Sequence, residues 1–142
     1  MANSLHVLVV EDDPDVAEYL RLVLVKKAGL RVAVAADAQA ATDILRRCEI
    51  HVLLTDIELP GCSGLELATR ARELVPSIAV AVMTAHTSAD YAVTANRCQA
   101  DDFLVKPIRA ATLISTVTLL AQLGRDPQCA QDADRQNAVV CA

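Results

Sequence analysis

The amino-acid sequence predicts an α/β domain in which helices cover both faces of a parallel sheet. Apolar runs of strand length alternate five times with segments of helical period, a pattern typical of such a sheet. The apolar residues are mainly Ala, Val and Leu, with one Phe, two Tyr and no Trp, which suits a sheet buried under closely packed helices. At 142 residues the chain is long enough for one domain with one core.

Five apolar runs are expected to form the strands, and each is bounded by polar or turn-forming residues. They are residues 7–10, 30–35, 52–56, 78–84 and 103–106. In a parallel sheet the carboxyl ends of all strands lie along one edge, so polar groups far apart in sequence converge there.

Each strand is followed by a segment with an apolar stripe at helical spacing. The first helix is expected to begin with Asp13 as its N-cap and Pro14 at its first position. The residues expected to be buried by four of the helices are Val16, Leu20, Val23 and Leu24; Ala41, Ile44, Leu45 and Cys48; Leu67, Ala71, Leu74 and Val75; and Leu113, Ile114, Val117 and Leu120.

The ends of the later helices are also marked in the sequence. Pro76 ends the third helix, and Gly124 is the expected stop of the last helix, which spans residues 110–123. The fourth helix, residues 88–97, has the poorest apolar stripe and is expected to be the loosest packed. Residues 1–124 are therefore expected to form the domain, and the polar residues 125–142 to form a tail or the start of a linker.

Composition excludes several classes of function. The net charge is −5 and no long basic run occurs, which argues against direct binding of nucleic acid or of an anionic membrane. The chain begins without the features of a secretory signal, and no apolar stretch approaches the ~20 residues that span a bilayer, so a cytoplasmic protein without membrane contact is expected.

The cysteines and two of the histidines are expected to play structural roles. The five cysteines are odd in number and show no Cys-x-x-Cys spacing, so they are expected to be reduced thiols, mostly in the core. They are Cys48, Cys62, Cys98, Cys129 and Cys141. His6 and His51 stand at strand starts, on the edge opposite the strand ends.

Acidic side chains at the carboxyl ends of two strands indicate a metal site. Glu11 and Asp12 follow the first strand and Asp56 ends the third, and three converging carboxylates repel one another unless a cation lies between them. Mg²⁺ suits a site with so few protein ligands, because it keeps several waters and binds phosphate oxygens. Asp12 and Asp56 are the expected direct ligands, the backbone carbonyl of Glu58 a third, and Glu11 a ligand through water.

Two further strand ends supply the groups that a phosphoryl transfer needs. With a metal screening its charge, the Asp56 carboxylate is able to attack phosphorus in line and form an aspartyl phosphate. Lys106 would neutralise one phosphoryl oxygen, and the Thr84 hydroxyl would donate to another.

These motifs together resemble the receiver domain of bacterial two-component response regulators. The residues that carry the resemblance are Glu11 and Asp12, the segment 56–64 with Pro60 and Gly64, Thr84 with Ala85, and residues 100–107. The resemblance covers residues 5–123 and implies a flavodoxin-like fold with strand order 2-1-3-4-5. It also implies Mg²⁺-dependent transfer of a phosphoryl group to Asp56, followed by hydrolysis, in a domain that catalyses only these two steps.

The same resemblance implies partners and a switch. The donor would be a histidine kinase, a histidine phosphotransfer protein or a small phosphodonor, and the reader a downstream protein or an output domain absent from the chain. In the family the hydroxyl at Thr84 moves toward the phosphoryl group and an aromatic residue at Phe103 turns inward, although Phe103 fits a core filler equally well. The surface of the fourth helix, fifth strand and fifth helix then changes, and this surface is also where a homodimer would form. Glu58 and His86 are expected to tune the lifetime of the phosphoryl group.

Three other functions remain open from the residues alone. An aspartate-nucleophile phosphatase of the haloacid dehalogenase type would need a second aspartate where Glu58 stands, together with a cap. A flavin carrier would need hydroxyl and amide groups where Glu11 and Asp12 stand. A receiver-like scaffold that is never phosphorylated would have no need of the metal site.

Overall fold

The described part of the chain forms a five-stranded parallel sheet. The computed structural model describes residues 5–85 and 100–125. The strands lie in the order β2-β1-β3-β6-β7, all parallel, which confirms the predicted fold class and strand order. Their bounds are β1 His6–Val10, β2 Arg31–Ala35, β3 Val52–Asp56, β6 Ala79–Thr84 and β7 Asp102–Val105.

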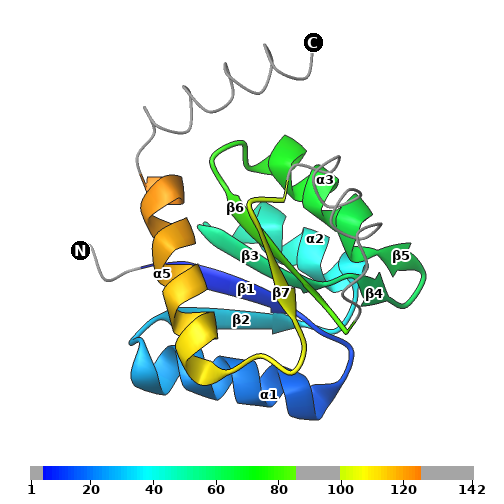
Figure 1. The fold of residues 1–142 in the computed structure, drawn as a ribbon. Helices are drawn as coiled ribbons and strands as arrows, with labels where there is room; N and C mark the ends of the chain where they lie inside the picture. The colour runs from blue at the N-terminus through cyan, green and yellow to red at the C-terminus, as the bar shows by residue number, and fades with distance from the viewer. Residues whose placement is uncertain (1–4, 86–99, 126–142) are drawn as a thin grey trace.

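Helices cover both faces of this sheet (Figure 1). On one face lie α1 (Pro14–Leu22), its π-helical continuation η1 (Val23–Lys27) and α5 (Ala110–Arg125). On the other face lie α2 (Ala38–Arg47) and α3 (Gly64–Leu74). The two faces form separate apolar clusters, because successive residues of a strand point to opposite sides of the sheet.

The burial of each strand follows from its place in the sheet. The central strands β3 and β6 are buried at every position, and β1 at all but its first residue. The edge strands β2 and β7 keep exposed positions, including Val34 and Val105. Strands covered on both faces read as continuous apolar runs, which is why the central strands were the easiest to predict from sequence.

Polar side chains fix the starts of three helices. Asp13 caps α1 as predicted, because its carboxylate accepts a hydrogen bond from the backbone N–H of Asp15. Asp37 caps α2 through the N–H of Ala40, and Ser63 caps α3 through the N–H of Leu65.

The segment that follows β3 contains regular structure of its own. It forms a short antiparallel hairpin of β4 (Glu58–Leu59) and β5 (Cys62–Ser63). Gly61 lies in the turn with φ of +72°, a conformation that favours glycine. The hairpin leads directly into α3, so the segment between β3 and α3 is fixed at both ends.

Several burial predictions were wrong at the ends of helices. Leu74, the last residue of α3, is 38% exposed, because the helix ends there at the rim of the core. Cys48 is exposed because it has left α2 and takes an extended conformation as its C-cap. Cys62, in β5, is partly buried and packs against the apolar cluster under α2 and α3. The last helix also continues through Gly124 to Arg125 and does not stop at the glycine.

Some predictions concern residues that the structure does not describe. They are the helix at 88–97, His86, the tail beyond residue 125, and Cys98, Cys129 and Cys141. Within residues 5–85 and 100–125, no helix combines the length and apolarity that a transmembrane span requires.

Candidate functional site at the carboxyl edge of the sheet

The structure brings the described predicted groups together at one edge of the sheet. Glu11 and Asp12 directly follow β1, Asp56 ends β3, and Lys106 directly follows β7. The strand register pairs Val10 with Thr55 and Thr84 with Val105, so all these ends lie at the same level. Parallel pairing is thus the reason that residues almost one hundred positions apart meet.

Lys106 joins two of the carboxylates. Its ammonium nitrogen lies 2.6 Å from Oε2 of Glu11 and 2.8 Å from Oδ2 of Asp56. The Lys106 side chain is 22% exposed, whereas those of Glu11 and Asp56 are only 1% and 10% exposed. Hydrogen bonds between ions are strong in such a partly buried setting, so Lys106 holds the two carboxylates at a short separation.

The Asp56 carboxylate accepts a hydrogen bond on each oxygen, and 10% of its side chain remains exposed. Its Oδ1 accepts a hydrogen bond of 3.1 Å from the backbone N–H of Glu58, while its Oδ2 accepts from Lys106. The backbone after Asp56 is fixed as well, because the Ile57 N–H donates to the carbonyl of Met83 at 2.8 Å. The carboxylate is therefore preorganised by the backbone of the segment that follows it and by the lysine that follows β7.

Gly64 allows the start of α3 to lie directly against the backbone of Asp56. A Cβ atom at position 64 would lie 1.9 Å from the Asp56 carbonyl oxygen and 2.9 Å from Cα of Ile57. Its N–H also donates to the carbonyl of Ile57 at 2.8 Å. Only glycine fits this close approach of two backbones, which fixes the segment that carries the acidic side chain.

The charges of Glu11 and Lys106 are coupled. Burial raises the pKa of Glu11, with a smaller rise from the Asp56 charge, against the lowering effects of Lys106 and of the hydrogen bond from the Asp13 N–H. Burial lowers the pKa of Lys106, but its hydrogen bonds to Asp56 and Glu11 outweigh burial, so this pKa is raised. The lysine therefore stays charged, while the acidic cluster gains from any further cation.

The acidic cluster meets the requirements of a divalent metal site. One carboxylate oxygen from each of Glu11, Asp12 and Asp56 lies within 4.8 Å of the other two, in a search of the described residues. Two of the three residues are buried and Asp12 is exposed, so the cluster is open to solvent on one side. Carboxylate oxygens with an open side suit a hard cation such as Mg²⁺, which keeps part of its water shell.

The other predicted site residues that the structure describes, Thr84, Glu58 and Phe103, differ in their burial. Thr84 is fully buried at the end of β6, and its carbonyl accepts a hydrogen bond of 2.7 Å from the N–H of Lys106. Glu58 is exposed at the start of β4 and contacts Asp56 through its backbone. Phe103 is partly buried in β7 and packs against the cluster under α2 and α3.

Sequence reasoning missed two contacts that shape the site. Gly64 was recognised only as part of a motif, although a glycine immediately after the Ser63 cap could have indicated a close backbone approach. The Tyr19 hydroxyl of α1 donates a 3.0 Å hydrogen bond to the Ile108 carbonyl, two residues after Lys106. Nothing in the sequence pairs two residues that lie 89 positions apart, so this contact needed the structure.

Comparison with known proteins finds similarity to response regulators. The family model described as the response regulator receiver domain matches residues 7–118. The transcriptional regulatory protein FixJ of Azorhizobium caulinodans is 36% identical over 139 residues, which are 98% of this chain and 64% of that protein. The response regulator protein PilR of Pseudomonas aeruginosa is 34% identical over 94% of this chain and 29% of its own length.

Solved structures agree with the fold. A putative response regulator from Chloroflexus aurantiacus is 30% identical, with a TM-score of 0.79 over 84% of this chain and 98% of its own. A CheY-like receiver domain protein from Methanospirillum hungatei has a TM-score of 0.80 at 24% identity, covering 86% of this chain and 97% of its own. This chain spans less than two thirds of the two curated regulators named above. Because the family model covers most of the chain and its acidic edge, the chain belongs to the receiver domain family of two-component response regulators.

Proposed function

We propose that the protein is a phosphorylation-dependent signalling switch that accepts a phosphoryl group on Asp56. The observation that carries the proposal is the Asp56 carboxylate, whose side chain is 10% exposed. It lies 2.8 Å from the Lys106 ammonium and shares a cluster with Glu11 and with the exposed Asp12. Family membership supports this function over the flavin carrier and the phosphatase considered from sequence.

The residues of the site have distinct proposed roles. Asp56 attacks phosphorus, Lys106 then binds a phosphoryl oxygen, and the Thr84 hydroxyl moves out to bind another. Glu11, Asp12, Asp56 and the Glu58 carbonyl would hold Mg²⁺. When bound, the metal supplies positive charge that screens the carboxylates from the incoming phosphoryl group.

Signalling follows from a change in conformer populations. The phosphorylated state favours the conformer in which Thr84 and Lys106 contact the new oxygens, and Phe103 is the proposed second switch residue. Partners would read this state on the surface of the fourth helix expected from sequence together with β7 and α5. We propose a histidine kinase or a histidine phosphotransfer protein as donor, and a downstream protein or an output domain as reader. Residues 1–124 would form the receiver unit and 125–142 a tail or linker.

The direct test is incubation with acetyl phosphate and Mg²⁺, followed by intact-mass measurement. The wild-type protein should gain the mass of one phosphoryl group, and the adduct should decay by hydrolysis. Asp56→Asn should gain none, while Asp43→Asn, a substitution of the same kind on α2, should behave like the wild type. Equal phosphorylation of the Asp56 variant and the wild type would refute the assigned acceptor.

A phosphatase and an inert scaffold give different results in the same assay. Steady turnover of small phosphomonoesters by the wild type would favour a phosphatase. No adduct from any phosphodonor in the presence of Mg²⁺ would favour a scaffold.

A further inference from the structure

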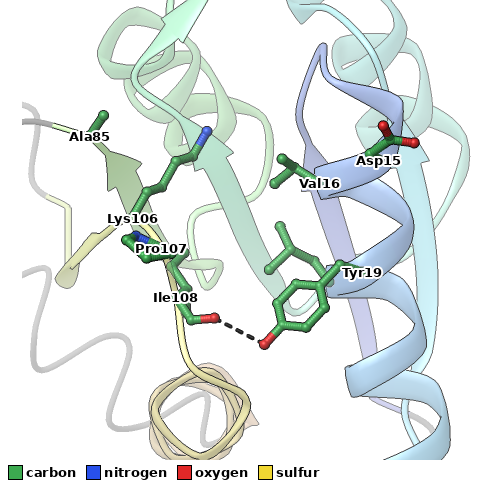
Figure 2. Close-up of a pocket in the computed structure, with 8 residues that line it drawn as sticks. Asp15, Val16, Tyr19, Ala85, Lys106, Pro107 and Ile108 are labelled. Carbon is green, nitrogen blue, oxygen red and sulfur yellow. Dashed lines mark hydrogen bonds between the residues drawn. The ribbon is translucent and has the colours of Figure 1, made fainter.

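A groove opens beside the proposed phosphorylation site, between α1 and the segment that follows β7 (Figure 2). Its volume is about 580 Å³. Val16 and Tyr19 of α1 lie on one side, and Ala85 with the segment Lys106 to Ile108 lies on the other. A volume of this size lies within the ~300–1,000 Å³ that small-molecule sites occupy.

The groove begins at the reacting groups. Lys106 lines it with its methylene chain, and the ammonium at the end of that chain contacts Asp56 and Glu11. At the other end, the hydrogen bond from the Tyr19 hydroxyl to the Ile108 carbonyl joins the two walls, as the dashed line in Figure 2 shows. A molecule whose phosphoryl group lies at Asp56 can therefore extend its remaining atoms along the groove.

The lining specifies the chemistry of such a molecule. Away from Lys106 and Asp15, the lining residues are uncharged, and Val16, Leu20, Ala85 and Pro107 offer only apolar side chains. Asp15 lies near the site end of the groove and would repel a second negative charge on the ligand. The groove thus suits an uncharged, apolar chain attached directly to a phosphoryl group.

We propose that this groove is a subsite for the acyl chain of small acyl phosphates, so that phosphodonors longer than acetyl phosphate react faster with Asp56. The inference rests on the proposed function, because it requires Asp56 to be the acceptor. In the reaction a bond forms between Oδ of Asp56 and phosphorus. The bond between phosphorus and the acyl oxygen breaks, and its electron pair leaves with the carboxylate product.

The experiment compares acetyl phosphate with butyryl phosphate. The two leaving carboxylates have nearly equal basicity, and a reference reaction of each donor with a small nucleophile in solution corrects for any difference in intrinsic reactivity. Second-order rate constants are measured by intact mass at donor concentrations below saturation, in Mg²⁺. A fully buried methylene contributes about fourfold in binding, so two methylenes in this open groove should give about a four- to tenfold faster reaction.

Two variants change the groove from opposite walls. Val16→Thr keeps the shape of the side chain but places a hydroxyl in the wall, and Ala85→Leu fills part of the space. Both should lower the ratio of the butyryl to the acetyl rate constant toward one. Val34→Thr, the same exchange at an exposed position on β2, should keep the wild-type ratio.

The outcomes separate this inference from the proposed function. Equal rate constants for the two donors in the wild type would overturn the subsite, as would a wild-type ratio in both groove variants. If the chain length of the donor has no effect, an apolar side chain of a protein donor becomes the favoured occupant of the groove. Failure of both donors to phosphorylate the wild type would instead refute the proposed function.

Discussion

Charged side chains are buried at the carboxyl edge of the sheet and exposed at its amino edge. At the carboxyl edge, Glu11 and Asp56 are buried together and share the Lys106 ammonium. At the amino edge, the charged side chains stay at the surface: Nε2 of His51 lies 3.4 Å from the carboxylate of Glu49, whose side chain is 85% exposed.

A hydrogen bond between the two histidines at the amino edge links β1 to the start of β3. The backbone N–H of His6 donates to Nδ1 of the His51 ring at 3.1 Å, which joins the first residue of β1 to the residue before β3. Burial, followed by Arg31 and then His51, lowers the pKa of His6, so this ring favours its neutral form. The same sheet therefore carries buried charges at its carboxyl edge, whereas the charged side chains Arg31 and Glu49 at its amino edge are exposed.

The largest loss of stability is expected from disrupting the close backbone approach of Gly64 to Asp56. Gly64→Ala places a Cβ against the Asp56 carbonyl, so the free energy of unfolding should fall by about 3 kcal/mol. Gly61→Ala is the matched control, because nothing lies within 4 Å of its Cβ and only the positive φ opposes alanine. The control should lose about 1 kcal/mol in urea unfolding. Equal losses would show that the close approach at position 64 is relieved by a small shift.

The next largest loss of stability is expected from removing the Lys106 ammonium at the acidic edge. Lys106→Met leaves the Glu11 and Asp56 charges without their partner, so the metal-free protein should lose about 2 kcal/mol of stability. Arg31→Met, at the amino edge, should change stability by less than about 0.5 kcal/mol. Adding Mg²⁺ should stabilise the Lys106 variant more than the Arg31 variant, because only the Lys106 variant has lost the cation of the acidic cluster. An equal response of both variants to Mg²⁺ would contradict the difference between the edges.

A smaller effect is expected from the metal itself. Mg²⁺ at ten times its dissociation constant should stabilise the wild type by about 1.4 kcal/mol, if the ion binds the folded state alone. Asp12→Asn should weaken this stabilisation, and Glu49→Gln at the other edge should not. Thermal unfolding with Mg²⁺ and with a chelator measures both responses. A chelator without effect on the wild-type melting temperature would argue against the metal site.

The smallest effect is the pH dependence of the amino edge. The pKa of His6 is lowered from its usual 6.5 in the folded state, so the unfolded chain binds a proton more readily. The contribution of His6 to stability is therefore complete above pH 6.5 and is lost as the pH falls through the lowered value. The difference in unfolding free energy between the wild type and His6→Gln should shrink over this range. A difference that stays constant with pH would contradict the lowered pKa.

Much of the fold and of the site could be predicted because each depends on a simple regularity. Continuous apolar runs predict the strands, and parallel pairing then brings Asp56, Thr84 and Lys106 to one edge whatever the details of the helices. The N-cap Asp13 was also confirmed, because a carboxylate followed by proline leaves little choice of local structure.

The features that could not be predicted depend on contacts between distant segments. Helical spacing assigns Leu74 to a buried stripe but does not say where the core ends. The apolar pattern also does not indicate the π-helical turn Val23–Lys27 or the hairpin after β3. The distance between Gly64 and the Asp56 carbonyl depends on how α3 packs, which no local pattern encodes.

The strand order has a kinetic consequence. Asp56 is on β3, which is paired on both sides, whereas Lys106 follows β7, which is paired only with β6. Outer strands separate from a sheet more often than inner ones, so amide hydrogen exchange should be faster in β7 than in β3. The Lys106 side chain can then move away from Asp56 and return while β3 stays in place. A reactant can therefore reach Asp56 without an opening of the whole domain.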